Sequence, residues 1–173
     1  LLSQTRDGRR LAEITSLDKA LALALAQNPD ISLGTPNRVY LSLPDKGGGS
    51  TCIVDYPSLP PLAGSWQYVC ATSNTFRKID GTGWIPVNFG SLPMVPLDNL
   101  AVDPMNDAQK GLYYTYAPGY EFNVQMESQK YEWGGSEDKE SVDGGNTIVL
   151  YEKGTNLNAA PKEVNARAAL TVR

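Results

Sequence analysis

The chain has 173 residues, of which 41% are hydrophobic and 20% charged, a balance typical of a single globular domain large enough to bury a core. Its net charge of −4 argues against a sequence-independent grip on a nucleic-acid backbone, which needs clustered lysine and arginine. The absence of histidine excludes the serine and cysteine catalytic triads, paired-histidine zinc motifs and the usual proton switch near neutral pH.

One long amphipathic helix is predicted for residues 6–27. An apolar stripe recurs there at three- and four-residue steps and is formed by Leu11, Ile14, Leu17, Leu21 and Leu25. The helix is expected to end near Asn28, because Pro29 pushes the residue before it out of the helical region. We expect the stripe to pack on the core of the same domain.

After residue 28 the sequence alternates between short β-prone segments and turn signals. This part holds all 12 prolines and all but one of the 16 glycines. Predicted strands cover residues 38–43, 66–70, 111–116, 121–126 and 147–152. The turn residues 117–120 predict a hairpin, and the glycine-rich segments 47–50 and 134–146 predict loops. Because helix and strands are segregated along the chain, the predicted class is α+β, with one N-terminal helix packed on a small antiparallel sheet with long irregular loops.

The chain is expected to divide into three segments. Residues 1–27 form the amphipathic helix, residues 28–157 form a globular head, and residues 158–173 form a C-terminal tail. The tail has few large apolar residues, so we expect it to be loosely held or foreign to the native protein.

Cys52 and Cys70 are the two cysteines of the sequence, and neither belongs to a Cys-x-x-Cys pair. Two thiols alone cannot complete a closed zinc site. We favour a single disulfide formed in an oxidising compartment, worth roughly 3 kcal/mol in the chain-entropy model. Two buried free thiols in a cytosolic protein are the alternative.

Four stretches, in their order along the chain, resemble type IV pilins and the pseudopilins of type II secretion. The basic helix segment 6–14 resembles the middle of the long pilin helix, just after its membrane-embedded half. The other stretches are 80–87 (DGTGWIPV), 100–106 (LAVDPMN) followed by 113–116, and 150–157 (LYEKGTNL). The family's prepilin leader and apolar half-helix are not in this sequence, and the resemblance implies that the chain begins where a soluble form lacking them would begin.

The resemblance implies a pilin-like fold and a structural subunit of an extracellular filament, which works by packing and is not an enzyme. It implies other pilin or pseudopilin subunits as partners, an inner-membrane-anchored precursor, and a role in adhesion, motility, DNA uptake or protein secretion. The cluster formed by Arg6, Arg9, Arg10 and Glu13 is then predicted to lie at a subunit interface, where ion pairs give specificity. An ordinary solvated helix end is the alternative.

The acidic segment 137–146 is a candidate for binding a hard cation. Calcium takes several oxygen ligands from one flexible loop, and Asp138, Glu140, Asp143 and Asn146 could supply them. The segment resembles the calcium loop of major pseudopilins, although its ligand spacing does not match residue by residue. A solvated acidic loop is the alternative, and no other cofactor is expected.

Trp66, Trp84 and Trp133 are predicted to lie in the core or at an interface, although aromatic rings can also form a sugar-binding platform. A secreted carbohydrate- or surface-binding module is therefore the alternative function. A small hydrolase that uses two carboxylates alone is a third hypothesis, but no spacing in the sequence nominates a pair.

Overall fold

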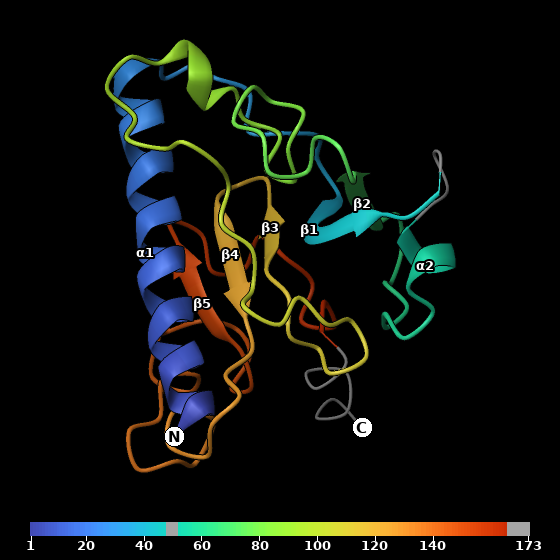
Figure 1. The fold of residues 1–173 in the computed structure, drawn as a ribbon, viewed down its shortest axis with the longest axis vertical. Coiled ribbons are helices and arrows are strands. Elements are labelled where there is room, and N and C mark those ends of the chain that lie inside the picture. Colours follow the sequence, from blue (N-terminus) through green and yellow to red (C-terminus); the bar gives the residue numbers. More distant parts are fainter. Residues whose placement is uncertain (48–51, 166–173) are drawn as a thin grey trace.

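The computed structural model describes residues 1–47 and 52–165 and has one long helix beside a five-stranded sheet (Figure 1). Along the chain the elements are α1 (Leu2–Gln27), β1 (Arg38–Asp45), α2 (Cys52–Asp55), β2 (Gln67–Thr72), the 3-10 helix η1 (Phe89–Ser91), β3 (Thr115–Ala117), β4 (Glu121–Val124) and β5 (Tyr151–Gly154). The predicted α+β class is confirmed. The predicted glycine-rich loop at 47–50 lies, apart from Gly47, outside the described residues.

The sheet is mixed, and the prediction of a purely antiparallel sheet is wrong. Its strand order is β2-β1-β3-β4-β5, with β1 and β2 parallel and the remaining neighbours antiparallel. Parallel neighbours need a crossover connection between them, and the segment that contains α2 supplies it. The sequence shows the length of this segment but not the direction in which the chain returns.

Helix α1 lies against β4 and β5 along the long axis of the molecule (Figure 1). Ile14, Leu17 and Leu21 of the predicted stripe are buried, while Leu11 and Leu25 are partly buried beside the same core. Each fully buried aliphatic side chain of this kind contributes about 1.5–3 kcal/mol of transfer free energy. The helix is 26 residues long and starts earlier than predicted, at Leu2, but ends just before Asn28 as expected.

The sheet separates two hydrophobic cores because successive side chains of a strand point to opposite faces. On β1, Tyr40 belongs to the core beneath α1, whereas Val39 and Leu41 belong to the core on the other face. The first core also holds Trp84 and Phe122. The second core is covered by the region around α2 and by residues near the C-terminal end of the described chain.

The predicted hairpin is confirmed, with Tyr116 of β3 paired with Phe122 of β4. Strand β3 is shorter than predicted, because Leu112 instead pairs with Asp107 in an isolated bridge. Strand β5 begins at Tyr151 instead of residue 147, since Val149 and Leu150 are buried in the second core as part of the preceding loop.

Residues 158–165 pack on the domain, unlike the loosely held tail expected there. Ala160 and Val164 are buried in the second core, and the Tyr113 hydroxyl donates a hydrogen bond to the Val164 carbonyl at 3.0 Å. The rest of the expected tail, residues 166–173, lies outside the described residues.

Candidate functional site

Arg10 is completely buried and forms the centre of an ionic cluster between α1 and the rest of the domain. Its guanidinium donates two hydrogen bonds to Asp103, at 2.6 and 2.9 Å. It also donates to Asp7 at 2.8 Å and to Glu127 at 3.1 Å. Burial alone would lower the pKa of Arg10, but these carboxylates, Asp103 first, raise it above its usual value. The guanidinium is therefore a fixed charge.

The carboxylates around Arg10 are held in turn by backbone N–H groups. Asp7 accepts hydrogen bonds from the amides of Glu127 and Ser128, at 2.9 and 2.8 Å, and Asp103 accepts one from the amide of Met105 at 2.8 Å. Each buried charge thus has several partners, which is what a desolvated ion cluster requires. The cluster joins α1 to two loops that are more than 90 residues away in sequence.

Arg6 and Glu127 extend the cluster towards the solvent. Arg6 donates two hydrogen bonds to Glu127, one of them at 2.7 Å from its Nε atom. The hydrogen bonds from Arg6, together with the one from Arg10, lower the pKa of the Glu127 carboxyl to about 2. Glu127 is therefore a carboxylate at any pH above strongly acidic values.

Two tyrosines fix α1 at further points along its length. Glu13 accepts a hydrogen bond from the Tyr114 hydroxyl at 2.6 Å and another from Arg9 at 2.7 Å. The Tyr120 hydroxyl donates to the side chain of Asp18 at 2.5 Å. These bonds place charged helix residues against the sheet rather than in open solvent.

The structure divides the four residues predicted at a subunit interface. Arg10 is enclosed by its own chain, Arg6 and Glu13 are partly buried in contacts within the chain, and only Arg9 has a side chain that is mostly exposed, at 59%. The interface role of these residues stays a prediction. Asp7, which the sequence also places beside these residues, is a buried member of the cluster, and the steps between Asp7, Arg10 and Ile14 continue the spacing of the apolar stripe.

The four calcium candidates are not brought together. Asp138 accepts hydrogen bonds from Gly134 and Ser141, and Glu140 is buried and accepts from two backbone amides elsewhere in the chain. Asp143 accepts hydrogen bonds from two other backbone amides, those of Gly145 and Glu152. The side-chain amide of Asn146 donates to a backbone carbonyl. Among residues 1–47 and 52–165, no three acidic or cysteine side chains are arranged to hold a metal ion.

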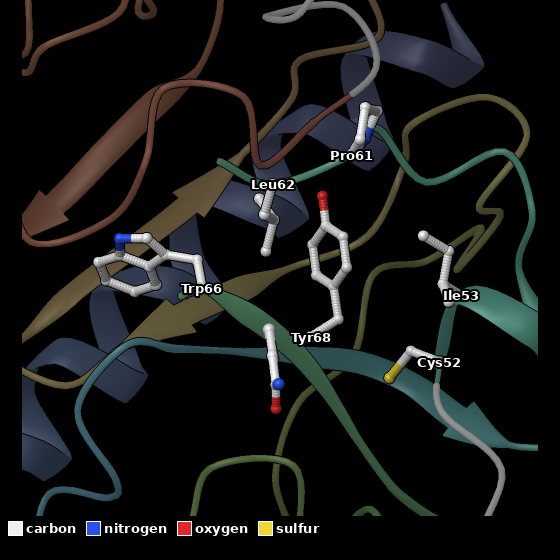
Figure 2. A pocket seen from close by; sticks show the side chains of 7 residues that line it. Cys52, Ile53, Pro61, Leu62, Trp66 and Tyr68 are labelled. Carbon is white, nitrogen blue, oxygen red and sulfur yellow. The ribbon is translucent and has the colours of Figure 1, made fainter. Parts of the chain in front are cut away.

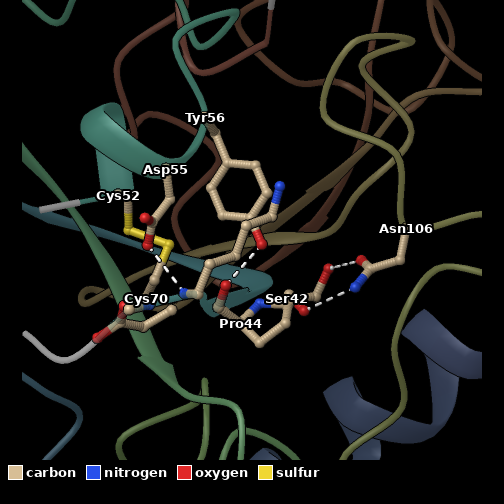
Figure 3. The surroundings of a disulfide bond; sticks show 10 residues. Ser42, Pro44, Cys52, Asp55, Tyr56, Cys70 and Asn106 are labelled. Atoms are coloured by element: carbon tan, nitrogen blue, oxygen red, sulfur yellow. Dashed lines mark hydrogen bonds between the residues drawn. A yellow bond between two sulfur atoms is a disulfide. The ribbon is translucent and has the colours of Figure 1, made fainter. Parts of the chain in front are cut away.

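A disulfide joins Cys52 of α2 to Cys70 of β2, in agreement with the sequence analysis (Figure 3). Nearby, the Tyr56 hydroxyl donates to the Pro44 carbonyl at 2.5 Å, and the Lys46 amide donates to Asp55 at 2.9 Å. These bonds fix the region of α2 against the end of β1, at the opposite side of the sheet from α1 (Figure 1).

A pocket of about 330 Å³ lies between β2 and the segment that follows α2. Its lining is mainly apolar and includes Trp66, Tyr68, Leu62, Pro61 and Ile53. Figure 2 shows the ring of Tyr68 pointing towards the segment that carries Pro61 and Leu62, where its hydroxyl donates to a backbone carbonyl at 2.7 Å. Ile53, which lines the pocket from α2, is 45% exposed.

The three tryptophans have different environments. Trp84 is buried in the core beneath α1, and its Nε1 donates to the Ala101 carbonyl at 2.9 Å. Trp66 is partly buried at the pocket, and Trp133 is 52% exposed. The prediction of a core residue is therefore confirmed for Trp84.

Comparison with known proteins found no matching family model, and no significant match among curated proteins or solved structures. Within the described part of the chain, no helix has both the length and the apolar character needed to cross a membrane.

Proposed function

We propose that this chain is the globular head of a subunit of an extracellular type IV pilus-like or pseudopilus filament. The observation that carries the proposal is helix α1, whose one face is fixed to the domain while the other is exposed. The fixed face carries Arg10 and Ile14, and the exposed face carries Ala12 and Leu23. A subunit that assembles through its helix needs this division of faces.

The proposed mechanism is packing rather than chemistry. In a filament of the kind that the resemblance implies, contacts between subunits apply force to the helix. That force reaches the rest of the domain only if helix and sheet move as one rigid body. The ion cluster of Arg10 resists sliding because its partners lie in distant loops. The disulfide holds α2 on β2, on the side of the sheet away from α1, and so stabilises that part of the domain.

Electron microscopy of cells that carry or lack the full-length gene tests this proposal. Ala12→Glu and Leu23→Glu place charge on the exposed face of α1, so we expect normal subunit levels but few filaments. Asn74→Glu is the matched control, because Asn74 is exposed in the turn after β2, at the edge of the sheet opposite β5. Cells with the intact gene but no filaments, or filaments unaffected by both helix variants, would overturn the proposal.

A second candidate, a surface-binding module, is favoured by the apolar pocket at Trp66. Aromatic rings beside a preformed concave surface suit the apolar face of a sugar ring. The test is titration of the protein with a panel of soluble glycans, followed by tryptophan fluorescence. Binding that is lost in Trp66→Ala and kept in Trp133→Ala would support this candidate, and an unchanged signal with every glycan would remove it.

A further inference from the structure

Two buried glutamates lie beside each other on the sheet face opposite α1. Glu121 of β4 and Glu152 of β5 are 1% and 2% exposed. The register pairs Glu121 with Gly154 and Asn123 with Glu152, so the two glutamates are diagonal neighbours on one face. Their side chains therefore lie on the same side of β4 and β5, each shielded from solvent.

Each glutamate also binds a segment that is not part of the sheet. Glu121 accepts hydrogen bonds from the Asn123 side chain at 2.9 Å and from the Ala160 amide at 2.8 Å. Glu152 accepts one from the Thr147 amide at 3.0 Å through Oε2. Its Oε1 atom is buried and has no donor among the described groups. A proton on one of the two carboxyls would supply the missing hydrogen bond.

Asp143 brings a third carboxylate to the same place. Its Oδ2 accepts the backbone N–H of Glu152 at 2.5 Å, and its Oδ1 accepts the Gly145 amide at 2.8 Å. Because β5 is the edge strand of the sheet, Asp143 covers an N–H group that would otherwise be open at that edge. Gly145 packs so closely on Glu152 that a Cβ atom there would overlap its carboxyl group.

No lysine or arginine of the described residues forms an ion pair with these carboxylates. Within residues 1–47 and 52–165, none of the three has an ion pair with lysine or arginine, and Lys153 instead lies 4.0 Å from Asp18 of α1. The other titratable neighbours are Asp138 and Tyr151, and neither supplies positive charge. Buried charge without a counter-charge is removed by protonation.

Burial raises the pKa of all three groups. The pKa of Glu152 is raised to about 8, by burial first and then by the negative charges of Glu121 and Asp143. Burial also raises the pKa of Glu121 and of Asp143. At neutral pH the site therefore holds at least one proton.

We propose that Glu121 and Glu152 share one proton and form an acid-locked clasp, which holds residues 143–147 and 159–160 on β4 and β5 and opens as the pH rises. The clasp consists of Glu121, Glu152 and Asp143. The protonated Glu152 donates through Oε1 to Glu121, and both glutamates keep their backbone partners. Opening uncovers the edge of β5 without disturbing the core beneath α1.

The pH dependence follows from proton linkage. In the open state both glutamates are solvated and titrate near 4.5, the reference value for this side chain. Between that value and about 8 the closed state holds a proton that the open state releases, so raising the pH favours opening. For one proton, the opening equilibrium grows by about tenfold per pH unit in this window and levels off above it.

Carbon-13 NMR of the glutamate side chains, combined with amide exchange, tests the clasp. We expect one glutamate carboxyl to titrate well above its ordinary range. The exchange protection of the Thr147 and Ala160 amides, corrected for intrinsic rates, should fall by about tenfold per pH unit in the same window. Protection of the Leu17 and Leu21 amides of α1 should not follow this dependence.

Variants separate the shared proton from other causes. Glu152→Gln keeps an acceptor for Thr147 and supplies a donor for Glu121, so it should remove the pH dependence and keep the loop closed. Glu121→Gln is the second variant, for use if the first does not fold, and the exposed Glu137→Gln is the control. Ordinary titration of every glutamate in the folded wild type, or an unchanged pH dependence in the Gln variants, would overturn the proposal.

Discussion

Replacing Arg10 with methionine should destabilise the domain far more than the same change at Arg9, one residue earlier on α1. Methionine keeps the apolar stem of Arg10 and removes four hydrogen bonds to three carboxylates. Asp7 and Asp103 have side chains with no exposed surface, so each is left as a buried charge. Removing one partner of a buried pair costs about 3–5 kcal/mol. Because Asp7 and Asp103 keep their backbone N–H donors, we expect about 3 kcal/mol.

The assay is urea unfolding followed by tryptophan fluorescence, with the melting temperature as a second measure. About 3 kcal/mol corresponds to a decrease of about 6–12 °C in a domain of this size. Arg9→Met is the matched control, because the Arg9 side chain is 59% exposed and an exposed ion pair contributes less than about 1 kcal/mol. Arg10→Lys keeps the charge without the two-pronged contact to Asp103 and should fall between the two.

The loss of stability in Arg10→Met should also depend on pH. Lowering the pH protonates carboxylates that have lost their cation, so the stability gap between Arg10→Met and wild type should narrow from pH 7 towards pH 4. Equal losses in Arg9→Met and Arg10→Met, or a gap that does not change with pH, would refute the view that Arg10 neutralises buried carboxylates.

Two further predictions concern the fall in unfolding free energy at acid pH and the contribution of the disulfide. The pKa of Glu127 is lowered to about 2 by hydrogen bonds from Arg6 first, so its contribution is present above 4.5 and is lost as the pH falls towards 2. Glu127→Gln should therefore flatten the fall in urea midpoint over that range, whereas Asp98→Asn, at an exposed loop position, should leave it unchanged. Replacing both Cys52 and Cys70 with serine should lower the free energy of unfolding by roughly 3 kcal/mol. The urea midpoint of this variant should not respond to reductant, whereas that of the wild type should fall. An equal response of wild type and variant to reductant would contradict this prediction.

Local patterns predicted the helix and the hairpin, because both depend on neighbours in sequence. The stripe of Ile14, Leu17 and Leu21 was visible as a 3.6-residue period, and the turn at 117–120 was visible as turn residues between alternating runs. Neither inference needed knowledge of the partner that covers these segments.

The parallel pairing of β1 with β2 depends on how a long connection returns to the sheet. Val39 and Tyr68 are paired in register, yet nothing in either strand specifies a parallel neighbour over an antiparallel one. The β-prone pattern of each strand fits either direction of pairing. The decision lies with the packing of α2 and the segment around it on the second core, and that packing involves contacts distant in sequence.

The sequence does not reveal the burial of Arg10, because charge on a helix usually indicates exposure. Asp7 and Arg10 occupy the buried face, and the spacing from Arg10 to Ile14 already placed them there. The sequence does not show that Asp103, which is 93 residues away, lies beside Arg10 and offsets the free-energy cost of its burial. The same applies to the clasp, since Glu121 and Glu152 meet only through the register of β4 and β5.

The ion cluster also explains how α1 keeps one position on the sheet. Ile14, Leu17 and Leu21 are similar in size and non-directional in their contacts, so a shift by one helical turn of about 5.4 Å would exchange one apolar contact for another at modest cost. The two-pronged contact of Arg10 with Asp103 does not survive such a shift, because its hydrogen bonds require both distance and direction. Hydrophobic burial therefore brings helix and sheet together, and the buried charges select the register. In the filament proposed above, a helix that passes force from one subunit to the next would need that second property as much as the first.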